Sequence, residues 1–158
     1  MDTAPRWLDA EQQHAWIGVA AMAIQLPGAL DAQLQRDSGL SLFEYFVLSR
    51  LSMTSDQTLR MSALAELANG SLSRLSNVVK RLEQRGWVRR SPDPDDGRAT
   101  VASLTPEGRR RVEEAAPGHV AEVRRLLIDV LNPEQLRAVG EAGAVVAATI
   151  RHGCPPPC

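Results

Sequence analysis

The sequence predicts a mainly α protein with one small β-hairpin, and three observations carry that prediction. Two short helical patterns, residues 61–68 and 71–85, are joined by the pair Asn69-Gly70, which tolerates positive φ. A loop rich in turn-forming residues follows, between two short strand-like runs. Long amphipathic patterns lie on both sides of this central part. Helix, turn, helix and hairpin in this order define a winged helix-turn-helix, to which the terminal helices add a region for dimerisation.

Residues 9–36 are predicted to be mostly helical, and Asp37-Ser38-Gly39 ends the segment. Pro27 lacks a backbone donor, so a kink or break is expected there. The apolar stripe follows a spacing of three and four. Its members are Trp16, Ala20, Ala23, Pro27, Leu30 and Leu34.

A second helix is predicted to start after Ser41, because Glu44 three residues later completes a capping box. It runs through Leu51 and is apolar nearly all round, which predicts the buried centre of the domain. Residues 58–60 could add a third strand beside the hairpin.

The helix predicted to begin at Ser71, a good N-cap residue, has two distinct faces. One face is expected to be buried: Leu72, Leu75, Val78, Val79 and Leu82. The other is polar: Ser73, Arg74, Ser76, Asn77, Lys80 and Arg81. Gly86 suits the left-handed position that ends the helix.

The hairpin consists of residues 87–91 and 99–104 around Pro92-Asp-Pro-Asp-Asp-Gly97-Arg98. Thr105-Pro106 then starts a helix to about Leu131, which Pro117-Gly118 should bend or interrupt. Its stripe is Val112, Ala116, Val123, Leu127 and Val130. Asn132-Pro133 with Gln135 starts a last helix, with the stripe Leu136, Val139, Gly143, Val146 and Ile150.

The sequence resembles the MarR family of bacterial transcription regulators in several motifs that occur in the same order. They are Ser73-Arg74, Leu82-Glu-Gln-Arg-Gly-Trp-Val88, Asp96-Gly-Arg98 and Leu104-Thr-Pro-Glu-Gly108. The resemblance implies a repressor whose terminal helices form a homodimer on a palindromic DNA duplex. It also implies release from DNA by a small aromatic or phenolic effector.

Charge is segregated along the chain, although the net charge is −1. Residues 60–111 hold 11 Lys/Arg against 6 Asp/Glu, whereas the rest holds 7 against 13. The basic part coincides with the predicted DNA reader, as is typical where one lobe meets phosphates.

No apolar run of about 20 residues is apparent, and the N-terminus lacks a signal-peptide pattern. A cytoplasmic protein with no membrane partner is therefore expected. Both cysteines, Cys154 and Cys158, lie in the last five residues, so no disulfide framework or cysteine-ligated metal site is expected. The tail, residues 153–158, is expected to be disordered.

The polar face of residues 71–85 supplies the candidate DNA contacts. Ser71 and Ser73 at the helix start suit a phosphate oxygen. Arg74, Asn77 and Ser76 lie in the first two turns, where Arg suits guanine and Asn suits adenine. Lys80 and Arg81 follow and suit phosphates. The alternative is a merely solvated face.

Arg98 at the hairpin tip is the candidate for the minor groove. The alternative role for Arg98 is a salt bridge to Asp95 or Asp96 that shapes the hairpin, and the two roles can coexist. The acidic cluster Asp93, Asp95 and Asp96 would repel phosphates unless it is neutralised.

Trp16, Met22, Phe43 and Tyr45 could line an effector crevice, with ordinary core packing as the alternative. Catalytic residues, metal ligands and cofactors are not expected, because the three histidines are far apart and no phosphate loop or nucleophile elbow occurs. An enzyme is therefore not predicted.

The predicted organisation has four parts. Residues 1–37 and 105–152 form the dimerisation region, 38–104 the winged helix-turn-helix, and 153–158 the tail. The predicted function is sequence-specific binding of double-stranded DNA. Two rivals stay open: an interaction module that sequesters another regulator without binding DNA, and a DNA binder with a redox switch at its two cysteines.

Overall fold

The computed structural model describes residues 5–68 and 70–152. The chain forms two compact units, residues 1–119 and 120–158, and each is described by itself. Asn69 in the predicted turn and the tail with Cys154 and Cys158 lie outside the described residues. The elements in chain order are α1 (Ala10–Ser38), α2 (Leu42–Ser52), β1 (Thr58–Arg60), α3 (Met61–Leu67), α4 (Leu72–Gln84), β2 (Val88–Pro92), β3 (Thr100–Leu104), α5 (Pro106–Val123), the π-helical turn η1 (Arg124–Ile128) and α6 (Pro133–His152).

Helix α1 is a single uninterrupted helix, so of the kink or break expected at Pro27 the break does not occur. Its ends are well capped. Asp9 and Gln12 form a capping box that the sequence analysis missed, and Gly39 ends the helix with a φ of 64°. Proline removes one backbone hydrogen bond, and the bonds of the remaining turns keep the helix continuous.

Helix α2 begins as predicted. The Ser41 hydroxyl accepts from the Glu44 N–H at 3.2 Å, and the Glu44 carboxylate accepts from the Ser41 N–H at 2.9 Å. Asp31 of α1 accepts from the Leu42 N–H at 2.7 Å, which ties the start of α2 to α1. These bonds fix the first turn of α2 beside the end of α1.

The two reader helices, α3 and α4, form where the pattern placed them. Ser71 caps α4 by accepting from the Arg74 N–H at 3.2 Å, and Gly86 follows the helix with a φ of 75°. Two apolar residues are exposed against the predicted pattern: Leu67 of α3 (44%) and Leu72 of α4 (55%). Both lie at the ends of short helices, where the inner face of the helix no longer meets the core.

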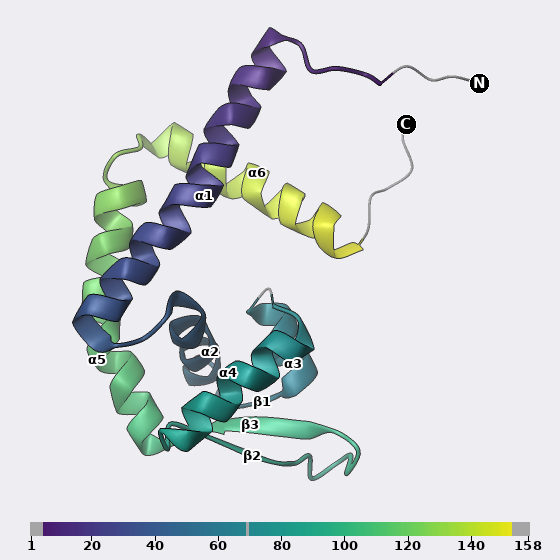
Figure 1. Ribbon diagram of the computed structural model, residues 1–158, viewed down its shortest axis with the longest axis vertical. Coiled ribbons are helices and arrows are strands. Elements are labelled where there is room, and N and C mark those ends of the chain that lie inside the picture. Colours follow the sequence, from purple (N-terminus) through teal and green to yellow (C-terminus); the bar gives the residue numbers. More distant parts are fainter. Residues whose placement is uncertain (1–4, 69, 153–158) are drawn as a thin grey trace. The chain divides into compact units, whose positions relative to one another are not determined.

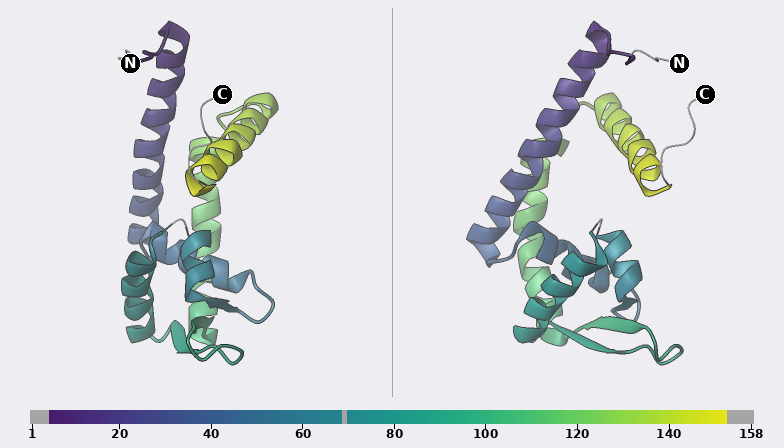
Figure 2. Two further views of the ribbon diagram at one scale, coloured as in Figure 1. Left: turned by 90° about the vertical axis from the view of Figure 1, so that its right-hand side faces the viewer. Right: turned by 45° about the vertical axis from the view of Figure 1, so that its right-hand side comes forward.

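The third strand predicted at residues 58–60 is confirmed. The sheet has the order β1-β3-β2 and is antiparallel throughout. Thr58 pairs with Ser103, and their side-chain oxygens lie 2.9 Å apart. Val88 pairs with Leu104 at the other side of β3. In Figure 1 the tip of the β2–β3 hairpin extends beyond α3 and α4 as a narrow loop, and Figure 2 shows the same hairpin from two further sides.

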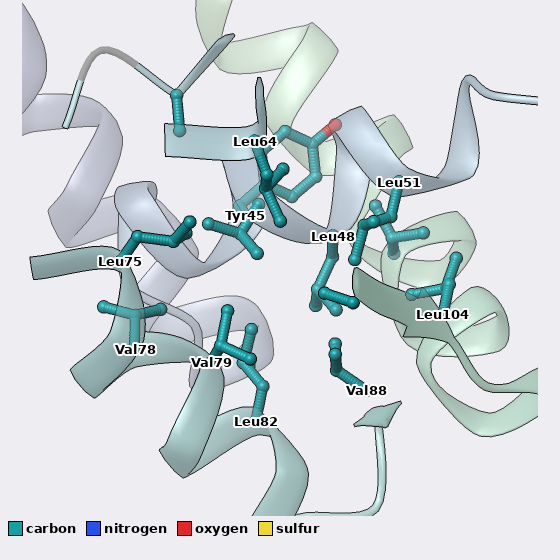
Figure 3. Packing of buried hydrophobic residues seen from close by; sticks show 14 of the residues in the cluster. Tyr45, Leu48, Leu51, Leu64, Leu75, Val78, Val79, Leu82, Val88 and Leu104 are labelled. Carbon is teal, nitrogen blue, oxygen red and sulfur yellow. The ribbon is translucent and has the colours of Figure 1, made fainter. Parts of the chain in front are cut away.

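The core lies where α2, α3 and α4 pack over this sheet (Figure 3). Leu75, Val79 and Leu82 of α4 are fully or almost fully buried against α2. Leu48 of α2 lies at the centre and is fully buried. This packing fixes one face of α4 inward and leaves its polar face outward.

Helix α5 starts at the predicted Thr105-Pro106 signal. The Thr105 hydroxyl accepts from the Gly108 N–H at 3.1 Å and donates to the Gly86 carbonyl at 2.7 Å. A β-carbon at Gly108 would lie 2.1 Å from the Trp87 carbonyl oxygen, so only glycine fits this close approach. Of the bend or interruption expected at Pro117-Gly118, the interruption does not occur, because α5 continues to Val123.

The second unit holds the end of α5, η1 and α6. Asn132 and Gln135 cap α6 reciprocally, with hydrogen bonds of 3.0 and 2.9 Å. This confirms the predicted start signal. Among the residues described, α6 has no buried side chain, and its predicted stripe is largely exposed in the single chain.

Helix α1 corrects one expectation about hydropathy. It contains an 18-residue window with a mean hydropathy of 1.3, so by length and composition it passes the test for a membrane span. The expectation that no apolar run approaches that length was therefore wrong. One such helix is weak evidence for a membrane span, because core helices of soluble proteins meet the same criterion.

Candidate nucleic-acid interface

The outer face of α4 carries most of the predicted DNA contacts. Ser73, Arg74, Asn77, Lys80 and Arg81 are exposed, and Ser76 is half-buried. The Ser71 hydroxyl is engaged in the helix cap. The first turns of α4 therefore present hydroxyl, guanidinium and amide groups together with backbone N–H groups, the combination that suits phosphates and base edges.

Arg74 is held by an aromatic ring. Its guanidinium carbon lies 4.3 Å from the centroid of the Phe43 ring, which comes from α2. A cation over an aromatic face is stabilised by the ring quadrupole. The contact joins the strongest candidate base reader to Phe43, for which an effector crevice or ordinary core packing had been expected.

Lys80 and Arg81, both predicted phosphate contacts, differ in their surroundings. Among the residues described, no ion pair involves Lys80. Arg81 pairs with the buried Glu44 at 3.4 Å, and Arg85 approaches the same carboxylate at 3.9 Å. Glu44 thus needs these arginines for its own burial. Arg81 consequently has a structural role as well as half-exposed donors.

Of the acidic cluster of the hairpin, Asp93 is buried, whereas Asp95 and Asp96 are exposed. The Asp93 carboxylate accepts from the Asp95 N–H at 2.9 Å and from the Arg60 side chain at 2.5 Å. Those two contacts, led by the Asp95 hydrogen bond, hold the pKa of Asp93 below its usual value. The carboxylate therefore stays ionised, and its ion pair with Arg60 offsets one of the three charges expected to repel phosphates.

Arg98 is exposed at the hairpin tip. Its backbone N–H donates to the Asp96 carboxylate at 3.1 Å. Within the described part of the chain, its guanidinium forms no ion pair, so Asp96 shapes the turn through the backbone of Arg98 and leaves the side chain available.

Two exposed residues were missed as candidates. Leu72 was expected to be buried, yet it lies beside Ser73 in the first turn of α4. Arg89 on β2 is exposed next to the buried Val88. The alternation of Val88 and Arg89 along the strand was a signal that could have identified Arg89.

A hollow of about 800 Å³ lies beside the reader, within the first unit. Pro27 and Asp31 of α1, Phe43 of α2, and Arg74, Asn77 and Arg81 of α4 are among the residues that line it. Of the four predicted effector residues, only Phe43 lines this hollow. Trp16 and Met22 are exposed on α1.

Tyr45, the fourth of those residues, is buried and packs against His119 with ring centroids 4.4 Å apart. Phe46 contacts the same imidazole edge-on at 6.5 Å. Among the described residues, the buried Nδ1 atom of His119 has no hydrogen-bond partner. Burial lowers the pKa of His119 and raises the pKa of Tyr45, because both charged forms lose hydration.

Acidification should therefore destabilise the fold through His119. Its pKa is lowered in the folded state, so the unfolded chain takes up the proton first. The contribution of neutral His119 to the free energy of unfolding is fully present above its pKa in the unfolded chain, about 6.5. This contribution is lost as the pH falls from there toward the pKa of His119 in the folded protein. The free energy of unfolding should fall between roughly pH 7.5 and 5.5 more steeply for the wild type than for His119→Gln. Equal slopes would show that His119 does not carry this dependence.

The described residues contain no cluster of histidine, cysteine or carboxylate residues able to hold a metal ion. His14 lies on the exposed part of α1, whereas His119 is buried among aromatic rings. A basic helix face beside a hairpin, both built on a three-helix core, defines a winged-helix DNA-binding protein.

Comparison with known proteins gives the family. The model of the MarR family matches residues 40–100. The crystal structure of Sco3205, a MarR family transcriptional regulator from Streptomyces coelicolor, in complex with DNA, is 44% identical, with a TM-score of 0.87. The match covers 92% of this chain and 91% of that one. The chain belongs to the MarR family. It is a DNA-binding transcription regulator and not an enzyme.

Two further relatives are similar over much of their length. AbsC, another MarR family regulator from Streptomyces coelicolor, is 36% identical with a TM-score of 0.89, and the match covers 94% of this chain and all of AbsC (100%). The transcriptional repressor MdtR of Bacillus subtilis (strain 168) is 31% identical over 100 residues, which is 63% of each chain.

Proposed function

We propose that the chain is a cytoplasmic repressor that binds a palindromic DNA duplex as a homodimer. The observation that carries the proposal is the polar face of α4, which the core turns outward with Arg74 and Asn77 exposed. The repressor role is supported by the similarity to MdtR, whose name describes a repressor. The similarity to Sco3205, whose crystal structure is a complex with DNA, supports DNA binding by this fold.

Each contact has a role that follows from its side chain. Ser71 and Ser73 would bind a phosphate at the start of α4. Arg74, Asn77 and Ser76 would read base edges in the major groove, and Leu72 would contact a thymine methyl group. Lys80 and Arg81 would hold phosphates one turn later.

The β2–β3 hairpin, which is the wing of the winged helix-turn-helix, would contact DNA through its tip. Arg98 carries an available guanidinium there, which suits a narrow minor groove. The bond between Arg60 and Asp93 supports this role, because it fixes the base of the loop and neutralises a charge that would repel phosphates.

The terminal regions, residues 1–37 and 105–152, would form the dimer interface. Residues 38–104 between them would form the winged helix-turn-helix that binds DNA. Large apolar side chains are exposed on α1 (Trp16, Ile17, Ile24) and on α6 (Val145, Val146, Ile150). Such surfaces are usually covered by a partner, and a symmetric dimer is the commonest solution. Sedimentation should give twice the mass of the chain, and a monomer at micromolar concentration would refute the dimer.

We also propose that an aromatic acid binds the hollow beside α4 and releases the DNA. Apolar Phe43 and cationic Arg74 and Arg81 line this hollow, which suits a ring that carries a negative charge. An occupant would engage Arg74 and thereby compete with the DNA for it. Titration of the protein–DNA complex with benzoate and with phenol should release DNA with benzoate at the lower concentration. No release by either probe would contradict this site.

The DNA-binding proposal is tested by selecting bound duplexes from a random pool. The expected winner is a palindrome whose half-sites are about ten base pairs apart, because the two α4 helices would enter successive major grooves. If no sequence is enriched, the proposal of a sequence-specific repressor is wrong. The alternative, a module that sequesters another regulator without binding DNA, would then be favoured.

A further inference from the structure

Phe43 occupies a fixed position at the start of α2. The capping box between Ser41 and Glu44 holds the first turn of this helix, and Asp31 of α1 accepts from the Leu42 N–H at 2.7 Å. Three hydrogen bonds therefore constrain the backbone on both sides of Phe43. Its ring has little freedom to shift with the backbone.

The ring of Phe43 lies close to both α4 and Gly70. The guanidinium carbon of Arg74 lies 4.3 Å from the ring centroid. The tip of the ring approaches Gly70, where an added β-carbon would lie 2.6 Å from the ring carbon Cζ. Glycine at position 70 is thus required for the ring to reach Arg74.

We propose that Phe43 is a positioning residue that orders Arg74 for base recognition before DNA binds. The inference rests on the proposed readout by Arg74. The ring contacts the central carbon of the guanidinium, whereas the N–H donors lie in the guanidinium plane and point outward from its edge. The ring therefore restricts the rotamers of Arg74 and leaves the paired donors that a guanine requires.

The neighbouring arginines show why a neutral ring suits this role. Arg81 and Arg85 are held by the Glu44 carboxylate, which satisfies part of their charge and their donors. No ion pair of Arg74 occurs in the part of the chain that is described. Its full positive charge and its donors consequently stay available to DNA, while its position is still constrained.

The test measures discrimination: the affinity for the selected duplex divided by the affinity for the same duplex with the Arg74-read base pair replaced. Phe43→Leu should reduce this ratio about two- to fivefold. Affinity for a non-specific duplex and the salt dependence should stay unchanged, because no phosphate contact is lost. Gly70→Ala, which keeps the ring but displaces it, should have the same effect.

Two controls separate positioning from core packing. Phe46→Leu removes a ring of α2 that packs against Tyr45 and His119 instead, so discrimination should be preserved. In an Arg74→Ala background, Phe43→Leu should lower discrimination no further.

An equal loss of affinity for all duplexes with Phe43→Leu would overturn the inference. A loss of discrimination with Phe43→Leu that persists without Arg74 would overturn it as well. If Arg74→Ala itself leaves discrimination intact, the proposed readout by Arg74 fails, and the positioning role falls with it. Loss with Arg74→Ala but not with Phe43→Leu refutes the positioning role alone.

Discussion

Leu48→Ala should lower the free energy of unfolding by about 2–5 kcal/mol, the largest effect expected of any single substitution considered. Leu48 is fully buried in α2, at the centre of the cluster that joins α2, α3, α4 and the sheet. Removing its branched end leaves a cavity that close-packed neighbours fill only in part. Because this cluster holds the inner face of α4, DNA binding should also be lost at a lower temperature.

Leu67→Ala is the matched control for this prediction. It makes the same chemical change at a leucine of α3 that is 44% exposed, so the stability should change by about 0.5 kcal/mol or less. Denaturant unfolding of both variants should be measured at one protein concentration, since dimerisation would link stability to concentration. Equal losses for the two variants would contradict the assignment of the core.

Arg74→Ala should reduce discrimination at one base pair of each half-site by about 1–3 kcal/mol. Arg74 is exposed in the first turns of α4, where its donors can form paired hydrogen bonds with guanine. Competition between the selected duplex and single-base variants would measure the loss position by position. Unchanged sequence preference would remove Arg74 from the readout.

Lys80→Ala provides the contrast for Arg74→Ala. Lys80 is exposed one to two turns later on the same face and has no base-reading geometry assigned to it. Its loss should weaken binding to all sequences alike and make the salt dependence shallower, as expected when one phosphate contact is removed. A change in sequence preference with Lys80→Ala would mean that the two roles had been assigned incorrectly.

Much of the fold could be predicted because its boundaries depend on local chemistry. The Ser41–Glu44 capping box, the Asn132–Gln135 pair and Gly86 after α4 all form as their sequence spacing indicates. Each of these signals involves residues no more than three positions apart. The hairpin was equally accessible, since turn-forming residues separate its two strand-like runs.

The wrong predictions concern positions where a local sequence signal did not determine helix continuity or side-chain burial. Pro27 and Pro117 were expected to bend or interrupt their helices, but both helices continue through them without interruption. Leu72 follows the apolar spacing of α4 and is nevertheless exposed. Spacing defines a face of the helix, whereas the extent of the neighbouring core decides which members of that face are covered.

The sequence predicted which residues belong to the candidate site, but not which tertiary contacts they form. The polar face of α4 follows from helical periodicity alone. The contact between Phe43 and Arg74 and the bond between Arg60 and Asp93 join residues that are 31 and 33 positions apart. The first contact depends on how α2 packs against α4, and the second on how β1 lies beside the wing. A local sequence pattern does not predict either arrangement.

The most direct test of DNA recognition compares the selected palindrome with a shuffled duplex of the same length and composition, over a series of salt concentrations. We expect the affinity for both duplexes to fall steeply with salt, because α4 and the wing are proposed to contact phosphates. The palindrome should bind at least about a thousandfold more tightly than the shuffled duplex at physiological salt. Equal and weak binding of the two duplexes at every salt concentration would contradict a sequence-specific reader.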